Sequence, residues 1–414
     1  PASTTRQALQ ISRTRNRKPR EDRSDMTTNG NSANGTKKDP VLVVVQLSGG
    51  NDFMNTLIPY TAGMYYDNRP LVGIPEDKSL PINDTLAFHP SAAPLKSMFE
   101  DGKVAIVQGI GYPNASRSHF RSMDIWHTCE PEIIATEGWL AKVIKQFDPN
   151  SANPLTGVSF GRGLPRAMAA PGVVATSVDD LDNYGLMTSI EADQRRAEDL
   201  AIFKRMYTPA IGSGLVMDYF SDTGQSVLSG ADLIKVAPQR YTSTVEYADN
   251  PIAKSLRDVA RVHTAELGTR IFYTQHGGYD HHAQEVPTHA RLLAELTGAI
   301  SDFWQDLREH DAADNVSMLV FTEFGRRIKD NGSGTDHGSG GGAFIIGDNV
   351  DGGLYAEYPS LAQADWERGE DLAHTFDFRG VYGTMLQKHL NVDPEPIVGG
   401  VYEQLHVYKE TANA

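Results

Sequence analysis

Apolar residues gather in five short runs along the chain. The first run, VLVVVQL, starts at Val41, is rich in β-branched residues and ends in the glycine turn SGGND. The other four are VAIVQGIG (104–111), TRIFYTQHGG (269–278), VSMLVFTEFG (316–325) and AFIIGDNV (343–350). Such runs are typical of strands that a parallel sheet buries on both faces.

Helical patterns lie between these runs. Apolar residues recur at helical spacing over 251–267 and 289–307, and a further helix is predicted over 191–207. The alternation of strands and helices predicts an α/β fold with a mostly parallel central sheet and helices on both faces. Ligands of such folds bind beyond the carboxyl ends of the strands, so polar residues at those ends are the candidates for chemistry.

The chain is expected to form one main domain with two tails. Residues 1–40 form a basic stretch predicted to be disordered, 41–402 the α/β domain, and 403–414 a C-terminal tail. The segment near 150–248 is richer in small and polar residues and is interpreted as an insertion or cap on the sheet.

Composition and charge exclude several classes of function. Lys and Arg number 38 against 53 Asp and Glu, a net charge of −15 that disfavours binding to nucleic acid. No run approaches the roughly 18 apolar residues of a membrane span, and residues 1–40 lack the apolar segment of a secretory signal. The single cysteine, Cys129, leaves only His, Asp and Glu to hold a metal.

Acidic and imidazole side chains follow three of the predicted strands. The loop GGYDHHAQ and the later segment GTDHGSGGG place carboxylates beside histidines, which suits a divalent cation with oxygen and nitrogen ligands. Zinc is favoured, with manganese, magnesium or calcium as alternatives. We expect one cleft to collect the candidate ligands Asp52, Asp280, His282, Glu323 and His337.

The segment GYPNASRSHF follows the second strand and precedes a helix through Met123 and Trp126. Ser118 is the first candidate for a nucleophile and Ser116 the second, although either serine can instead cap the helix. Arg117 is expected to hold an anion, and His119 is a further candidate for catalysis or for metal binding. A water molecule would replace the serine as nucleophile if neither hydroxyl approached the metal.

These motifs together resemble those of the bacterial DUF1501 family. The resemblance rests on LVVVQLSGGNDFMNTLIPY, SRSHF, GGYDHHAQ, TEFGRR and GTDHGSGGG, and it extends from about Val41 to Tyr402. In outline the family is similar to the alkaline phosphatase and sulfatase superfamily, which implies an alkaline phosphatase-like fold. The sulfatase signature around a cysteine or serine is absent, which disfavours a formylglycine sulfatase.

The resemblance implies two metal positions. The first corresponds to Asp280, His282 and His337, and the second to Asp52 and Glu323 together with the nucleophile. Phe324 stands where the second position usually has a histidine, and His119 could substitute for that missing ligand. His281 departs from the family pattern and either adds a ligand or faces solvent. His127 and His374 are assigned ordinary surface or capping roles.

Two functions follow from this interpretation. The first is a metal-dependent hydrolase of phosphate or sulfate esters, acting on a small molecule or a glycan. The alternative is a non-catalytic or structural relative with a degenerate metal site, serving an assembly or binding glycans, and Phe324 favours it. Relatives are often exported, but the sequence predicts no compartment for this chain.

Overall fold

The computed structural model describes residues 38–184 and 233–410, together with residues 195, 198, 199, 201, 202, 205, 230 and 231. The chain divides into the units Pro1–Lys38 and Asp39–Ala414, and the fold described here belongs to the second. The predicted disorder of residues 1–37 and most of the predicted helix over 191–207 lie outside the described residues.

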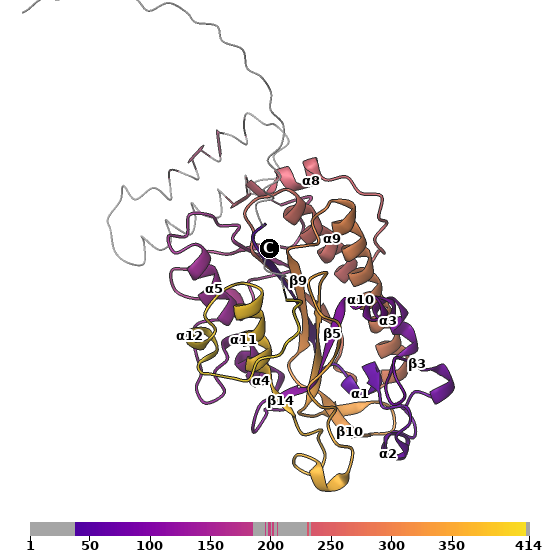
Figure 1. The fold of residues 1–414 in the computed structure, drawn as a ribbon. Helices are drawn as coiled ribbons and strands as arrows, with labels where there is room; N and C mark the ends of the chain where they lie inside the picture. Colours follow the sequence, from indigo (N-terminus) through magenta and orange to yellow (C-terminus); the bar gives the residue numbers. More distant parts are fainter. Residues whose placement is uncertain are drawn as a thin grey trace, which may run out of the picture. The chain divides into compact units, whose positions relative to one another are not determined.

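A large, mostly parallel sheet forms the centre of the second unit (Figure 1). Strand β1 (Val41–Ser48) lies between β8 (Ile271–Gly277) and β9 (Val316–Thr322) and runs parallel to both. In the described part of the chain, the other strands of this nine-stranded sheet are β5 (Val104–Gly111), β6 (Gly157–Phe160), β7 (Thr176–Val178), β12 (Gly341–Ile346), β13 (Gly353–Tyr355) and β14 (Phe376–Asp377). The order is β13-β5-β12-β9-β1-β8-β6-β7, with β14 beside β5. This confirms the predicted α/β class and the five predicted strands.

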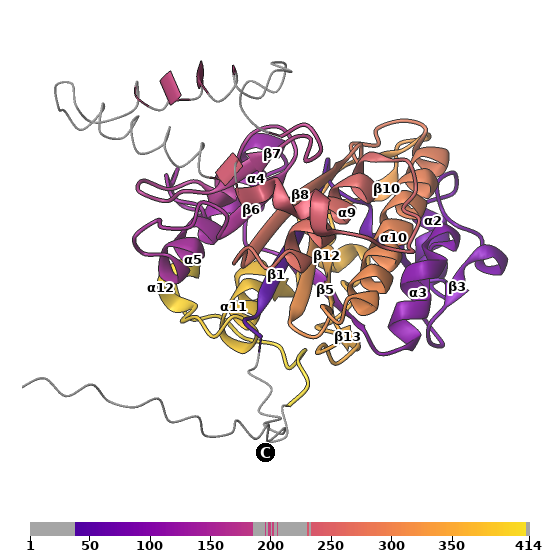
Figure 2. The same ribbon diagram turned by 90° about the horizontal axis from the view of Figure 1, so that it is seen from above.

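Helices cover both faces of the sheet (Figures 1 and 2). One face packs against α3 (Ala93–Glu100), α9 (Pro251–Thr264) and α10 (Glu285–Glu309). The other packs against α4 (His119–Thr128), α5 (Trp139–Phe147), α11 (Phe378–Lys388) and α12 (Glu395–Val398). Alternate residues of β1 face the two cores, so the strand is apolar on both sides, as its sequence predicts.

Local sequence sets the ends of these helices. Asn250 caps α9 by accepting a hydrogen bond from the backbone N–H of Ala253, and Pro251 occupies the first helical position. Asp377 caps α11 in the same way. The left-handed backbone of Cys129 ends α4.

The sheet register brings several chain segments to one edge. Ser48 lies opposite Gly277 and Leu47 opposite Thr322, so β1, β8 and β9 end together. Strand β12 runs antiparallel to its neighbours β5 and β9, so the segment that precedes β12 also lies at this edge. The loops after β5, β8 and β9 therefore meet the loop that leads into β12.

Parts of the two segments that the sequence sets apart pack with the main sheet. Strands β6 and β7, which lie within 150–248, belong to the central sheet. Both are short, which left little apolar signal in the sequence. The C-terminal segment packs on the domain as far as residue 408, because Leu405 and Val407 are buried and Tyr408 bridges to Val350.

Smaller elements complete the described structure. They are α1 (Phe53–Thr56), α2 (Gly63–Asn68), α8 (Val236–Arg240), the hairpin β10 (Arg326–Asp330) and β11 (Thr335–His337), a sheet of β2 (Leu57–Ile58), β3 (Leu80–Pro81) and β4 (Ala87–Phe88), and four 3-10 turns at Glu76–Lys78, Pro90–Ala92, Arg166–Met168 and Gln363–Asp365. Among the described residues, no helix is both long and apolar enough to cross a bilayer.

Candidate metal centre

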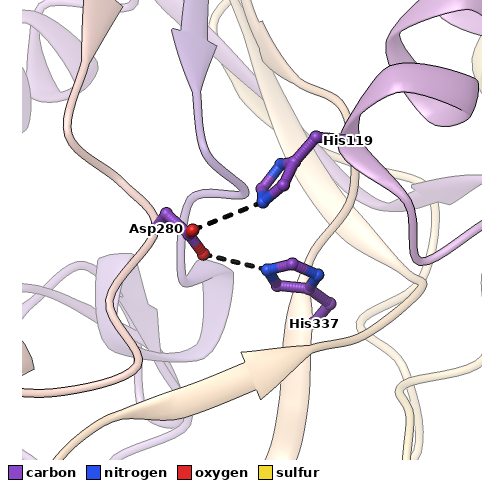
Figure 3. A group of neighbouring side chains, drawn as sticks. All are labelled: His119, Asp280 and His337. Atoms are coloured by element: carbon purple, nitrogen blue, oxygen red, sulfur yellow. Dashed lines mark hydrogen bonds and ion pairs between the residues drawn. The ribbon is translucent and has the colours of Figure 1, made fainter.

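Three side chains from distant parts of the sequence converge at this edge of the sheet. His119 begins α4, Asp280 follows β8, and His337 ends β11. One ligand atom from each lies within 4.8 Å of the others, and both histidines point at the Asp280 carboxylate (Figure 3). His337 Nε2 lies 2.9 Å from Asp280 Oδ1, and His119 Nε2 lies 3.5 Å from Asp280 Oδ2. His282 joins them, with its Nε2 3.1 Å from Asp280 Oδ1.

Each of the three imidazoles has an oxygen acceptor at Nδ1. The contacts are His119 to Glu323 Oε1 at 2.9 Å, His282 to Asp336 Oδ1 at 3.0 Å, and His337 to the carbonyl oxygen of Arg117 at 2.9 Å. Such an acceptor requires a hydrogen on Nδ1, so Nε2 has a lone pair when the ring is neutral and a second hydrogen when the ring is protonated. An oxygen behind the ring is also how proteins orient histidines that bind metals.

When the rings are neutral, the lone pairs on Nε2 of His282 and His337 face each other. His282 Nε2 lies 3.0 Å from His337 Nε2, which is unfavourable for two lone pairs unless a proton or a cation lies between them. His119 Nε2 is buried and has no hydrogen-bond partner among the described residues. The donor set of imidazole nitrogen and carboxylate oxygen therefore fits a divalent cation such as zinc.

Arg326 connects the loops that carry this cluster. Its buried guanidinium donates to the carbonyl oxygens of Gly50 at 2.7 Å, Tyr279 at 2.7 Å and Thr335 at 2.9 Å, and to Asp280 Oδ1 at 2.9 Å. Partial burial alone would raise the pKa of Asp280, but the hydrogen bonds from His337 and Arg326 outweigh it and hold that pKa well below its ordinary range. The carboxylate is thus charged and positioned.

The glycine turn after β1 allows the close approach of the Asp280 loop. Gly49 has a φ of +122°, and a Cβ on this residue would overlap the backbone nitrogen of Asp280. Its own N–H donates to Glu323 Oε1 at 2.9 Å. Gly49 is therefore required by the site as well as by the turn.

Glu323 lies behind His119, where it orients the ring. Its Oε1 accepts from His119 and Gly49, and its Oε2 accepts from the hydroxyl of Thr322 at 3.0 Å. His119 in turn has a raised pKa, chiefly because of its hydrogen bond to Glu323. His119 thus faces Asp280 directly, and Glu323 contacts the opposite nitrogen of the His119 ring. The sequence had predicted Glu323 itself as a ligand.

Phe324 closes one side of the cluster. Its buried ring lies 4.9 Å from the ring of His119 and 4.8 Å from that of His337, centroid to centroid. An apolar ring supplies no ligand here, so nothing at this position supports the second metal of the predicted pair.

Asp52 does not join the cluster, contrary to the predicted convergence. It caps α1, is fully buried and forms an ion pair with Arg69. Burial alone would raise its pKa, but the charge and hydrogen bond of Arg69 together with a hydrogen bond from Glu285 outweigh burial and hold the pKa well below its ordinary range. Spacing along the chain does not reveal this partner, because Arg69 lies at the end of α2.

The predicted roles of the SRS segment also change. The guanidinium of Arg117 donates two hydrogen bonds to buried Asp371, at 3.0 and 2.7 Å. Its charge is therefore already paired with a carboxylate of the protein. Ser116 Oγ accepts from the backbone N–H of Ser118 at 3.2 Å, and Ser118 precedes α4 without a side-chain capping bond. Neither serine lines the cavity described next.

His281 is neither a ligand nor exposed. It is buried, with its ring centroid 5.4 Å from that of His289 and 5.9 Å from that of Tyr279. The fold turns its side chain away from its two neighbours Asp280 and His282, which face the cluster.

A cavity of about 530 Å³ opens beside the cluster. His119, Asp280 and Glu323 line one end, and the α4 residues Phe120, Met123, Asp124 and His127, with Arg166, line the rest. Gln46 and Ser48 from the end of β1 complete the wall. His127 is therefore no surface residue: it is buried and hydrogen bonded to Gln46 and Tyr273.

Comparison with known proteins identifies the family. Residues 135–393 match the profile described as "Protein of unknown function (DUF1501)". The chain belongs to the DUF1501 family. The matched region contains Asp280, His282, Glu323 and His337, and it begins after His119. No curated protein matches this DUF1501 chain significantly.

Several solved structures share parts of the fold of this DUF1501 protein. One is the PsFucS1 sulfatase from Pseudoalteromonas sp., with 10% identity over 89% of this chain and 71% of that one, and a TM-score of 0.41. Another is a protein in the alkaline phosphatase superfamily from Vibrio parahaemolyticus, with 9% identity, 78% and 64% coverage, and a TM-score of 0.37. A third is the lipoteichoic acid synthase LtaP from Listeria monocytogenes, with 9% identity, 77% and 68% coverage, and a TM-score of 0.37. TM-scores of this size assign no activity.

Proposed function

We propose that this DUF1501 protein is a metal-dependent hydrolase of phosphate or sulfate esters. The observation that carries the proposal is the orientation of His119, His282 and His337. Each has an oxygen at Nδ1 and turns Nε2 toward Asp280. These residues would hold one divalent cation, with zinc favoured by the donor set. When bound, the cation supplies Lewis-acid polarisation of an ester oxygen.

The protein's own groups prepare the site for an anionic ester. The α4 helix begins at His119, so its positive dipole end lies beside the cluster and favours a negatively charged group. Asp280 is held charged by Arg326, and Glu323 and Asp336 fix the rings of His119 and His282. The ester would occupy the cavity with its anionic end at the cluster and its leaving group along α4.

The cavity suits a small substrate or one end of a glycan. Its volume of about 530 Å³ lies within the usual range for small-molecule sites. The mixture of exposed Phe120 with polar Asp124 and Arg166 would accept a leaving group that has both apolar and hydrogen-bonding parts. Either a small-molecule ester or a glycan ester meets this description.

The test is turnover of 4-nitrophenyl phosphate and 4-nitrophenyl sulfate by protein loaded separately with zinc, manganese, magnesium or calcium. We expect hydrolysis of at least one ester, bound metal near one ion per chain, and loss of both in Asp280→Asn. That variant keeps the shape of the side chain and removes its charge. Bound metal without turnover of either ester would contradict the proposal.

One observation favours the non-catalytic alternative. Phe324 packs against His119 and His337 and leaves the cluster without a second imidazole at that position. A protein that retains one structural metal would bind zinc tightly, gain stability from it, and hydrolyse neither ester. Metal content and turnover measured on the same preparation separate the two functions.

A further inference from the structure

A buried polar group lies under the cavity, away from the metal ligands. Gln46, His127 and Tyr273 are at most 6% exposed, although Gln46 sits inside an otherwise apolar strand. His127 Nε2 lies 3.1 Å from Gln46 Oε1 and 3.0 Å from the Tyr273 hydroxyl, which also donates to Gln46 Oε1. Burying polar side chains costs free energy of folding unless they are hydrogen bonded, so a buried network of this kind indicates a structural or functional role.

The network fixes which way the Gln46 amide faces. Its Oε1 accepts from Tyr273 and His127, so its Nε2 is the end that reaches Ser48, where it donates to Oγ at 2.8 Å. Burial lowers the pKa of His127 to about 4, so the ring is neutral near pH 7. A neutral His127 ring with its hydrogen on Nε2 can donate to Gln46 Oε1, which agrees with this orientation of the amide.

Ser48 is the residue at which this network reaches the cavity. It is half-buried and lines the same cavity as His119, Asp280 and Glu323. Its backbone carbonyl accepts from the N–H of Tyr279 at 3.1 Å, and the next residue, Gly49, donates to Glu323. Ser48 Oγ already accepts a hydrogen bond, and no acceptor for its own hydrogen is found in the described part of the chain.

The geometry points to Ser48 as a residue that contacts the substrate, with Gln46 as its positioning residue. The Ser48 hydroxyl donates its hydrogen to an oxygen of the bound phosphate or sulfate group. This inference rests on the proposed function for the identity of the reacting group. It replaces Ser116 and Ser118, which do not line the cavity, as the serine of the site.

The experiment is calorimetric titration of zinc-loaded protein with inorganic phosphate, alongside turnover of 4-nitrophenyl phosphate. Loss of a hydrogen bond to a charged group weakens binding by about tenfold or more, so Ser48→Ala should lower phosphate affinity by that factor at unchanged zinc content. Ser48→Thr keeps a hydroxyl and should stay within about threefold of the parent. Ser116→Ala and Ser118→Ala carry the same chemical change outside the cavity and should bind phosphate like the parent.

The role of Gln46 is tested by a double-mutant cycle. Gln46→Glu is nearly isosteric but removes the donor to Ser48, and it should weaken phosphate binding. If Gln46 acts through Ser48, the variant with both Gln46→Glu and Ser48→Ala should bind phosphate no more weakly than Ser48→Ala alone. A purely structural role would instead give additive losses.

The outcomes separate this inference from the proposed function. Phosphate binding that depends on Ser48 in a protein without turnover would reject the hydrolase and retain Ser48 as an anion contact. Equal phosphate affinity of the parent and Ser48→Ala, or no phosphate binding by the zinc-loaded parent, would overturn the inference. Melting curves show whether each variant is folded. If Ser48→Ala does not fold, Ser48→Cys replaces it in the titration, because a thiol is of similar size and is only a weak hydrogen-bond donor.

Discussion

The Nε2 atoms of His282 and His337 face each other at 3.0 Å, although each ring has an oxygen acceptor at Nδ1. Two neutral rings in these tautomers bring lone pair against lone pair, and a bound cation turns this repulsion into two favourable bonds. The pair is thus arranged so that a shared proton or a bound cation between the two nitrogens would stabilise it.

The first prediction concerns affinity for zinc. His337→Ala removes one Nε2 from the cluster, and the dissociation constant for zinc should rise by more than about 100-fold. Competition with a chromophoric chelator measures the change. His406→Ala is the matched control, because His406 is exposed and lies outside the cluster, and its affinity for zinc should equal that of the parent.

The second prediction concerns the carboxylate behind His119. Glu323→Gln keeps the shape of the side chain but weakens the hydrogen bond from His119 Nδ1, and zinc affinity should fall by about 10- to 100-fold. Glu370→Gln makes the same change at a carboxylate that pairs with Arg117 and Arg327. Equal zinc affinities in the two variants would show that the charge of Glu323 does not support the site.

The third prediction concerns stability. Chelation with EDTA should lower the melting temperature of the zinc-loaded protein by about 5 °C or more, because a ligand that binds only the folded state stabilises it. Added zinc should restore the original value. In His337→Ala the same treatment should leave the melting curve unmoved, and a shift there equal to the parent's would place the responsible metal elsewhere.

The fourth prediction is a dependence of stability on pH. Burial raises the pKa of Glu285 to about 9, from an ordinary value of 4.5, so the folded protein holds a proton there that the unfolded chain releases. Stability from this group is complete below pH 4.5 and is lost as the pH rises towards about 9. Urea midpoints at pH 5 and pH 8.5 should therefore differ less in Glu285→Gln than in the parent.

Glu295 provides the control for this experiment. Partial burial alone would raise its pKa, but hydrogen bonds from Arg291 and His276 outweigh it and leave that pKa lowered. The stability that Glu295 contributes is therefore lost as the pH falls below its ordinary pKa, and it does not change between pH 5 and 8.5. Glu295→Gln should keep the decline of the parent over this range, and a flattened profile in both variants would remove the assignment to Glu285.

The fifth prediction separates two roles of Arg117. The structure pairs it with buried Asp371, so Arg117→Ala should destabilise the protein by about 2 kcal/mol or more while leaving the KM for an aryl phosphate unchanged. Arg162→Ala, at an exposed ion pair with Asp179, should cost well under about 1 kcal/mol. A raised KM at full stability would restore the anion-binding role predicted from the sequence.

The sequence predicted the long strands of the sheet, because burial on both faces leaves a continuous apolar run. Continuous apolar runs gave β1, β5, β8, β9 and β12, because a strand buried on both faces has no polar positions. The same reasoning placed Asp280, His282 and His337 at one edge, since the loops that carry them meet there. The short strands β6 and β7 could not be found in this way, because four and three residues carry too little pattern.

The roles of individual side chains were harder to predict. Asp52 and Arg117 looked available for chemistry in the sequence, but Arg69 and Asp371 reach them from other loops and neutralise them. Which of His119 and Glu323 faces Asp280 depends on side-chain directions that spacing does not encode. The sequence does contain one signal for the buried polar network: Gln46 interrupts an apolar strand two residues before Ser48.

The origin of the cluster in separate segments has a consequence for how the chain is held together. His119 begins α4, Asp280 follows β8 and His337 ends β11, so the cluster forms only when these three segments meet. A bound ion would link these segments in the folded protein, where a chain with one cysteine has no internal disulfide to do so. Metal binding would then require all three segments to be in place. Uptake of the ion during refolding would therefore mark the completion of this edge of the sheet.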